Sequence, residues 1–218
     1  MNPHPGPLRS RQSLRTATVV IAVITAAAWL VMSALGWGDQ AAATMGFIPD
    51  RFSGGVLPFP AVPAALTPLT ATLVHGDFLH LALNLLILLW SGSWVERVLG
   101  TRATVGIYVI SAYAAALAQW AAGPHMNVPM IGASGAIGGL IGAFALSFGK
   151  PRRVVKSERV NRWLNALWLL AAWVVLQLMT AFLAGAQGLL LATPAHVGGF
   201  LAGLAMQRPL LLWRYRNA

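Results

Sequence analysis

The sequence predicts an all-α membrane protein in which six transmembrane helices form one bundle and both termini lie in the cytoplasm. Of its 218 residues, 57% are hydrophobic and 9% are charged, whereas about 25% of a soluble domain is charged. The chain also contains six apolar runs that suit a bilayer core, which a helix crosses in about 20 residues. Finally, all but one of its 15 Lys and Arg residues lie in segments that a six-helix topology places on one side.

The six apolar runs are expected to be helices, because every backbone polar group in lipid must be satisfied within the protein. The first run contains 21 residues, which exceeds the roughly 7–15 residues of a signal-peptide core and favours a retained membrane anchor. After the first loop the connections are too short to join separate domains. The runs cover residues 16–36, 78–99, 102–122, 134–149, 163–183 and 193–213.

The charge distribution predicts the orientation and the tails. Residues 1–15 are polar, basic and contain proline, so we expect a disordered cytoplasmic tail before a membrane domain at 16–213 and a second cytoplasmic tail at 214–218. Lys and Arg concentrate on the cytoplasmic side of membrane proteins, and only Arg51 falls outside, which predicts a multi-pass protein of the inner (plasma) membrane. The formal net charge of +10 therefore indicates contact with an anionic lipid bilayer and not nucleic-acid binding.

The first loop, residues 37–77, is long and apolar. Proline prevents a continuous helix there, so we expect an irregular segment in the membrane interface, with a loose linker as the alternative. At its end, His75 and Asp77 are expected to cap the second helix, and His125 is expected to lie in a later loop. The four closely spaced prolines of the first loop are Pro58, Pro60, Pro63 and Pro68.

Four polar side chains within the spans have similar predicted depths. The spans that carry His80 and Asn84, Ser134 and His196 all descend from the outer side. Counted from the charged residues at their inner ends, a rise of about 1.5 Å per residue places these side chains roughly 18–24 Å above the cytoplasmic boundary. Strongly polar groups within a membrane are costly and usually mark function. The sequence therefore predicts one site made from three helices.

These residue types suit acyl transfer by a serine nucleophile. Serine needs an adjacent base, and His196 can take its proton and return it to a leaving amine. Unpaired N–H groups at the helix start beside Ser134 can bind an oxyanion, and His80 and Asn84 can donate further hydrogen bonds to it. No carboxylate is expected at this depth, so the residues predict a Ser–His dyad with no third member, and no metal site.

Each of these residues also has a structural explanation. Ser134 lies among Gly-x-x-x-Gly pairs that favour close helix packing. His196 alone can be a buried, satisfied imidazole, and His80 with Asn84 can form an interhelical hydrogen-bonded pair. The common depth of the four favours the catalytic interpretation. The absence of cysteine excludes disulfides and thiolate metal sites.

With these residues in place, the chain resembles the rhomboid family of intramembrane serine proteases. The resemblance covers about residues 17–207, with the motifs in the family's order and on the matching helices. The motifs that carry it are His75-x4-His80-x3-Asn84 and Glu96-Arg97 on the second span, Gly132-Ala133-Ser134-Gly135 at the fourth, and Ala195-His196-x2-Gly199-x3-Gly203 on the sixth.

The resemblance implies a rhomboid-like six-helix bundle with Ser134 as nucleophile and His196 as general base, and no cofactor. It also implies that Gly132 shapes the loop before the serine and that the Ser134 amide, His80 and Asn84 form the oxyanion hole. Substrates would be single-span membrane proteins, cut near the outer edge of the span after a small residue. They would enter laterally past the fifth span and the first loop.

Two positions depart from the family's pattern. Many members carry a Trp-Arg pair in the first loop, and this loop has only Arg51 and no tryptophan after Trp37. Many members also place an aromatic residue four positions after the serine, beneath the catalytic histidine, where this chain has Gly138.

Three functions compete at this stage. A protease is favoured by Ser134 and His196 together. A catalytically weak or inactive rhomboid-like scaffold that binds transmembrane helices is the alternative, and it is disfavoured by the intact pair. A transporter is disfavoured because the sequence shows no inverted repeat and the spans carry no charged residue at the midplane of the membrane.

Overall fold

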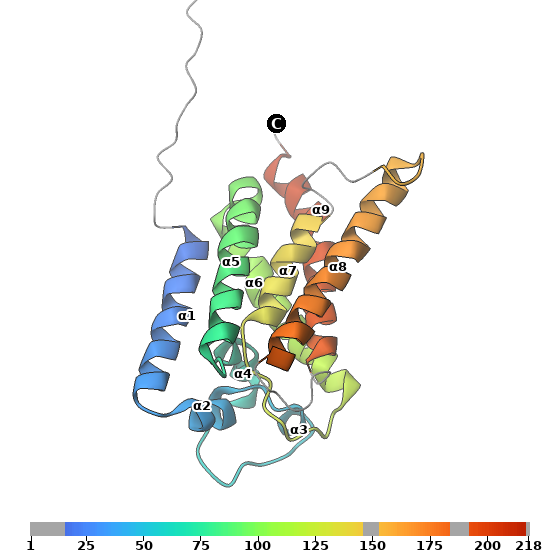
Figure 1. Ribbon diagram of the computed structural model, residues 1–218. Helices are drawn as coiled ribbons and strands as arrows, with labels where there is room; N and C mark the ends of the chain where they lie inside the picture. The colour runs from blue at the N-terminus through green and yellow to red at the C-terminus, as the bar shows by residue number, and fades with distance from the viewer. Residues whose placement is uncertain (1–15, 146–152, 184–191, 217–218) are drawn as a thin grey trace, which may run out of the picture.

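Helices make up nearly all regular structure in this computed structural model, which describes residues 16–145, 153–183 and 192–216 (Figure 1). The longer helices are α1 (Ala17–Ala34), α5 (Phe78–Leu99), α6 (Thr101–Ala122), α7 (Ser134–Ala145), α8 (Glu158–Leu183) and α9 (Thr193–Arg214). The shorter ones are α2 (Gly38–Met45), α3 (Pro49–Phe52) and α4 (Thr67–Thr70), with 3-10 turns at Ala64–Leu66 and Ala71–Leu73.

The longer helices match the expected apolar runs in number and order. Helix α8 begins earlier than expected, at Glu158, and α7 is described only as far as Ala145, so residues 146–149 of the expected fourth span lie outside the described residues. Among the described residues, four helices are long and apolar enough to cross a membrane by length and composition, namely α1, α5, α6 and the Glu158–Met179 part of α8.

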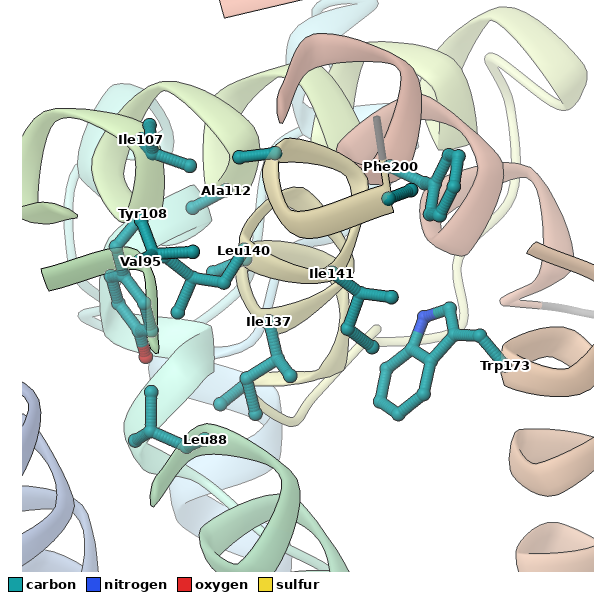
Figure 2. Packing of buried hydrophobic residues seen from close by; sticks show 14 of the residues in the cluster. Leu88, Val95, Ile107, Tyr108, Ala112, Ile137, Leu140, Ile141, Trp173 and Phe200 are labelled. Carbon is teal, nitrogen blue, oxygen red and sulfur yellow. The ribbon is translucent and has the colours of Figure 1, made fainter. Parts of the chain in front are cut away.

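Helix α7 forms the centre of the bundle, with α5, α6, α8 and α9 around it and α1 beside α5 at the edge (Figure 1). All of its residues except Phe144 are buried. The apolar side chains of α7 fill the space between its neighbours (Figure 2). The core they share contains Ile137, Leu140 and Ile141 of α7, Leu88 and Val95 of α5, Ile107 and Tyr108 of α6, Trp173 of α8 and Phe200 of α9.

Glycines bring α7 and α9 into backbone contact. A Cβ on Gly199 would overlap the carbonyl oxygen of Gly135, and one on Gly203 would overlap that of Gly139. The helices approach this closely only because no side chain separates them at these points. The Gly-x-x-x-Gly pairs are therefore confirmed as packing positions, and they place the first turns of α7 and α9 side by side.

The carboxylate of Glu96 fixes the start of α1 against the end of α5. It accepts hydrogen bonds from the backbone N–H groups of Ala17 and Thr18 at 2.8 and 3.0 Å, and from the hydroxyls of Thr18 and Thr101 at 2.6 and 2.9 Å. A negative charge at a helix N-terminus satisfies unpaired donors and interacts favourably with the helix dipole. Glu96 thus joins three helices.

The first loop is folded and anchored, so the loose-linker alternative is wrong for the described residues. Phe47 and Met130 exchange two backbone hydrogen bonds of 2.9 and 2.8 Å, which ties this loop to the segment before α7. Arg51 donates to the Val62 carbonyl at 2.8 Å, and Tyr113 of α6 donates to another loop carbonyl at 3.0 Å. As expected from its prolines, the loop contains only short helices. Arg51 makes its contact with this loop without a tryptophan partner in the described part of the chain.

The structure places the start of α1 and the end of α9 at the same end of the bundle, opposite the short helices α2–α4 (Figure 1). This arrangement agrees with an even number of passes through the bundle. The expected tail at residues 1–15 lies outside the described residues.

The backbone contact between α7 and α9 predicts a size limit at Gly199. A Gly199→Ala change should lower the free energy of unfolding by about 1–3 kcal/mol, the usual cost of overpacking. The matched control is Gly106→Ala in α6, where a new Cβ meets no atom within 4 Å and should raise stability by up to about 1 kcal/mol through helix propensity. Thermal unfolding in detergent measures both, and equal effects would contradict the packing argument.

Candidate active site

Ser134 and His196 lie in hydrogen-bonding contact. The Ser134 Oγ is 2.9 Å from the His196 Nε2. Ser134 is the first residue of α7 and His196 lies in the first turn of α9. Their exposed fractions are 6% and 7%. The structure therefore brings together the two residues that the sequence pairs across 62 positions.

The backbone before Ser134 makes a sharp turn at Gly132. This glycine has a φ of +106°, a conformation that side-chain-bearing residues rarely adopt. Its N–H donates to the Ala71 carbonyl at 2.9 Å, and the Ala133 carbonyl accepts the first hydrogen bond of α7, from Ile137, at 2.9 Å. The N–H groups of the first turn of α7, beginning with that of Ser134, therefore have no acceptor within the helix and carry the positive end of its dipole.

His80 packs directly against that turn. A Cβ on Gly132 would lie 2.7 Å from the His80 Nε2. Asn84, one turn further along α5, is 1% exposed, and its Nδ2 donates to the His80 carbonyl at 2.8 Å. The Oδ1 of Asn84 has no hydrogen-bond partner among the described residues. The structure thus brings His80 to the loop that precedes Ser134 and buries Asn84 one turn further along α5.

The two expected caps of α5 have different roles. Asp77 is the N-cap and accepts a hydrogen bond from the His80 N–H at 2.8 Å, as expected. His75 does not cap the helix, because its ring is buried and packs edge-on against His80 with centroids 4.9 Å apart. Burial, assisted by the neighbouring His80, lowers the pKa of His75 to about 3, so this ring is neutral at physiological pH. His125 is an exposed loop residue, as expected.

The support of His196 comes from an unexpected residue. Its Nδ1 has no hydrogen-bond partner within the described ranges, so no carboxylate among them orients the imidazole. Trp173 of α8 instead lies 6.1 Å away, centroid to centroid, with the two rings inclined at 72°. The only signal for this residue in the sequence is helical spacing, since Ala166, Trp173 and Gln177 are spaced to share one face of α8, which the structure buries.

The pair lies under cover in this conformation. A cavity of about 260 Å³ opens on the side of the short helices, where Trp29 of α1 and His75 line it. Neither Ser134 nor His196 lines this cavity. The low exposure of Ser134 and His196 shows that neighbouring parts of the protein cover the pair in this conformation.

Comparison with known protein families places the chain. The sequence model of the Rhomboid domain matches residues 64–213, which include the turn at Gly132 and both members of the Ser134–His196 contact. The chain belongs to the rhomboid family.

Individual relatives agree with this membership. The chain is 32% identical over 145 residues to RHOMBOID-like protein 5 of Arabidopsis thaliana, covering 64% of this chain and 42% of the relative. It is 30% identical over 136 residues to Rhomboid protease GlpG of Pectobacterium atrosepticum, covering 62% and 44%. A third relative, Rhomboid protease GlpG of an Enterobacter strain, is 32% identical over 139 residues, covering 63% and 45%. The matched segment spans less than half the length of each relative.

The turn before the serine predicts that Gly132→Ala harms the site specifically. The new Cβ would displace His80 as well as strain the backbone, so both stability and the reactivity of Ser134 toward a fluorophosphonate should fall, the latter by about 10- to 100-fold. Gly54→Ala is the matched control, because Gly54 has a φ of +99° and open space around it. Its free energy of unfolding should fall only by the cost of the strained backbone, about 1–3 kcal/mol. Equal loss of Ser134 reactivity in both variants would contradict a role for the contact with His80.

Proposed function

We propose that this rhomboid is an intramembrane serine endopeptidase that cleaves transmembrane segments of single-span membrane proteins. The observation that carries the proposal is the buried contact of 2.9 Å between the Ser134 Oγ and the His196 Nε2. Two bacterial relatives named as rhomboid proteases support it. The chain's membership of the rhomboid family also supports this class of reaction.

In the proposed reaction, Ser134 is the nucleophile and His196 is the general base. His196 carries its proton on Nδ1, so that Nε2 accepts the hydrogen bond from the serine hydroxyl and takes its proton during attack on the scissile carbonyl. The same Nε2 proton then passes to the leaving amine. Water deprotonated by His196 hydrolyses the acyl-enzyme and restores Ser134. Because no carboxylate among the described residues meets Nδ1, the machinery is a dyad.

The oxyanion of the tetrahedral intermediate would be bound at the start of α7. The Ser134 N–H is the first candidate donor, because it points from a helix N-terminus with no acceptor in the helix. His80 lies against the Gly132 turn, and Asn84 is buried one turn below it with a side-chain amide that carries two N–H groups. Gly132 fixes the shape of this turn. A single oxyanion donor contributes about 100- to 1,000-fold to the rate in a serine protease.

The proposal includes six membrane spans, with both termini cytoplasmic, in the inner (plasma) membrane. The two helices to be added to the four apolar candidates are α7 and α9, which pack against them in one bundle. Substrates would reach Ser134 laterally past α8. This helix supports such a movement because it exposes many large apolar side chains and buries only a narrow face, and among the exposed ones are Trp163, Leu167, Trp168, Val175 and Met179.

Cleavage of a model transmembrane substrate in proteoliposomes tests the function. Wild type should release the product, and Ser134→Ala and His196→Ala should each reduce kcat by at least about 1,000-fold, because loss of either member of the pair removes the activated nucleophile.

Matched controls separate catalysis from folding. Ser91→Ala removes another buried serine, whose hydroxyl donates only to the Ile87 carbonyl of its own helix, and His125→Ala removes an exposed loop histidine. Both should cleave at the wild-type rate. If Ser134→Ala released as much product as wild type, the protease proposal would be wrong. Helix binding without cleavage by wild type would favour the scaffold alternative.

A further inference from the structure

We propose that Trp173 is the positioning residue for the imidazole of His196, and that Gly138 leaves the space in which its indole lies. The proposal rests on the proposed function, since it assigns a role to Trp173 through the catalytic base. The space in question lies next to His196, where α7 carries Gly138 and therefore has no side chain.

The contacts of His196 leave its ring orientation underdetermined without Trp173. The imidazole has a hydrogen bond to Ser134 through Nε2, and its Nδ1 has no partner among the described residues. One hydrogen bond fixes the distance between two groups but permits rotation about it. Trp173 is 3% exposed and meets the imidazole at a centroid distance of 6.1 Å and an angle of 72°. This geometry falls in the range of favourable edge-to-face aromatic pairs.

Gly138 and Trp173 fit each other as a pair. A Cβ on Gly138 would lie 3.2 Å from the Trp173 Nε1 and 3.2 Å from the His196 carbonyl oxygen. The space beneath His196 is therefore already filled by the indole, which reaches from α8 toward α7 beside Ile141 (Figure 2). A larger residue at 138 and the indole at 173 compete for the same volume.

Burial of the indole N–H of Trp173 at this position lowers the stability of the folded state. Its Nε1 is a buried donor without an acceptor in the described part of the chain, and an unsatisfied buried donor destabilises the folded state. The other tryptophans of α8, Trp163 and Trp168, are 49% and 68% exposed. Trp173 therefore differs from its neighbours in both burial and contact, and the ring, not the N–H, carries its role.

The test uses the full-length protein in detergent and two readouts. The first is the second-order rate constant for fluorophosphonate labelling of Ser134, and the second is kcat and KM for a transmembrane peptide substrate. Trp173→Leu keeps apolar volume without a ring and should lower both kcat and the labelling rate by about 10- to 100-fold, because a shift of reacting groups by about 1 Å costs about 100-fold. KM should change less than threefold. Trp173→Phe should retain at least a third of the wild-type labelling rate, and Trp168→Leu, the matched control, should label at the wild-type rate.

A double-mutant cycle gives a result that a general packing role does not predict. Gly138→Tyr alone should lower the labelling rate, because the new side chain competes with the indole. Combined with Trp173→Ala, the same Gly138→Tyr change should raise the rate at least fivefold above that of Trp173→Ala alone. Trp173→Leu with the wild-type labelling rate, or a double variant no faster than Trp173→Ala, would overturn the proposal. The melting temperature of each variant shows which rates come from folded protein. If Trp173→Ala does not fold, the test is whether adding Gly138→Tyr restores folding and labelling. Restored folding and labelling support the proposal, and a double variant that stays unfolded or unlabelled overturns it.

Failure of the protease proposal has a separate signature. A wild-type protein that neither labels at Ser134 nor cleaves substrate would refute the proposed function whatever happens at Trp173. In that case, experimental structures of wild type and Trp173→Leu decide the positioning role. A changed rotamer of His196 in the variant supports it, and an unchanged rotamer overturns it.

Discussion

The backbone contact between α7 and α9 is the constraint on which the rest of the site depends. Two helices that meet through glycine have their axes close enough for side chains of their first turns to touch, and Ser134 and His196 occupy those turns. A Cβ on Gly199 would overlap the backbone of α7, so Ser134 and His196 remain in contact only while these positions stay small. The remaining helices hold this pair in place by enclosing α7.

The candidate site is assembled from side chains that carry no permanent charge, which suits its burial. A serine hydroxyl, a neutral imidazole and an amide can be buried with hydrogen bonds and packing, whereas an unpaired carboxylate at the same place would be far more costly. Glu96, a buried acidic residue of α5, lies at the opposite end of that helix from His80, where four donors satisfy its carboxylate. In the proposed mechanism, a ring contact and a backbone turn supply the orientation that a third catalytic carboxylate provides in other serine proteases.

Much of this arrangement was predictable from the sequence. The rest depends on which face each helix turns toward its neighbours, which apolar patterns do not determine. Apolar length located the helices, and the depth of Ser134 and His196 predicted their contact because both begin spans that run in the same direction. The rotation of each helix about its axis was not predictable. The sequence contains nine tryptophans, and burial against His196 distinguishes Trp173 from the other tryptophans of α8. For the same reason the sequence predicts a capping role for His75, although tertiary contacts bury its ring against His80.

Site-resolved labelling with a fluorophosphonate tests the central claim most directly. A phosphonyl adduct forms only where a hydroxyl is activated by an adjacent base, so mass spectrometry of the treated protein reports the Ser134–His196 pair without requiring a natural substrate. The account predicts one adduct, on Ser134, that disappears when His196 is replaced by alanine in a variant that still folds. An adduct that persists at the wild-type rate in that variant, or none on Ser134 in the wild type, would contradict it.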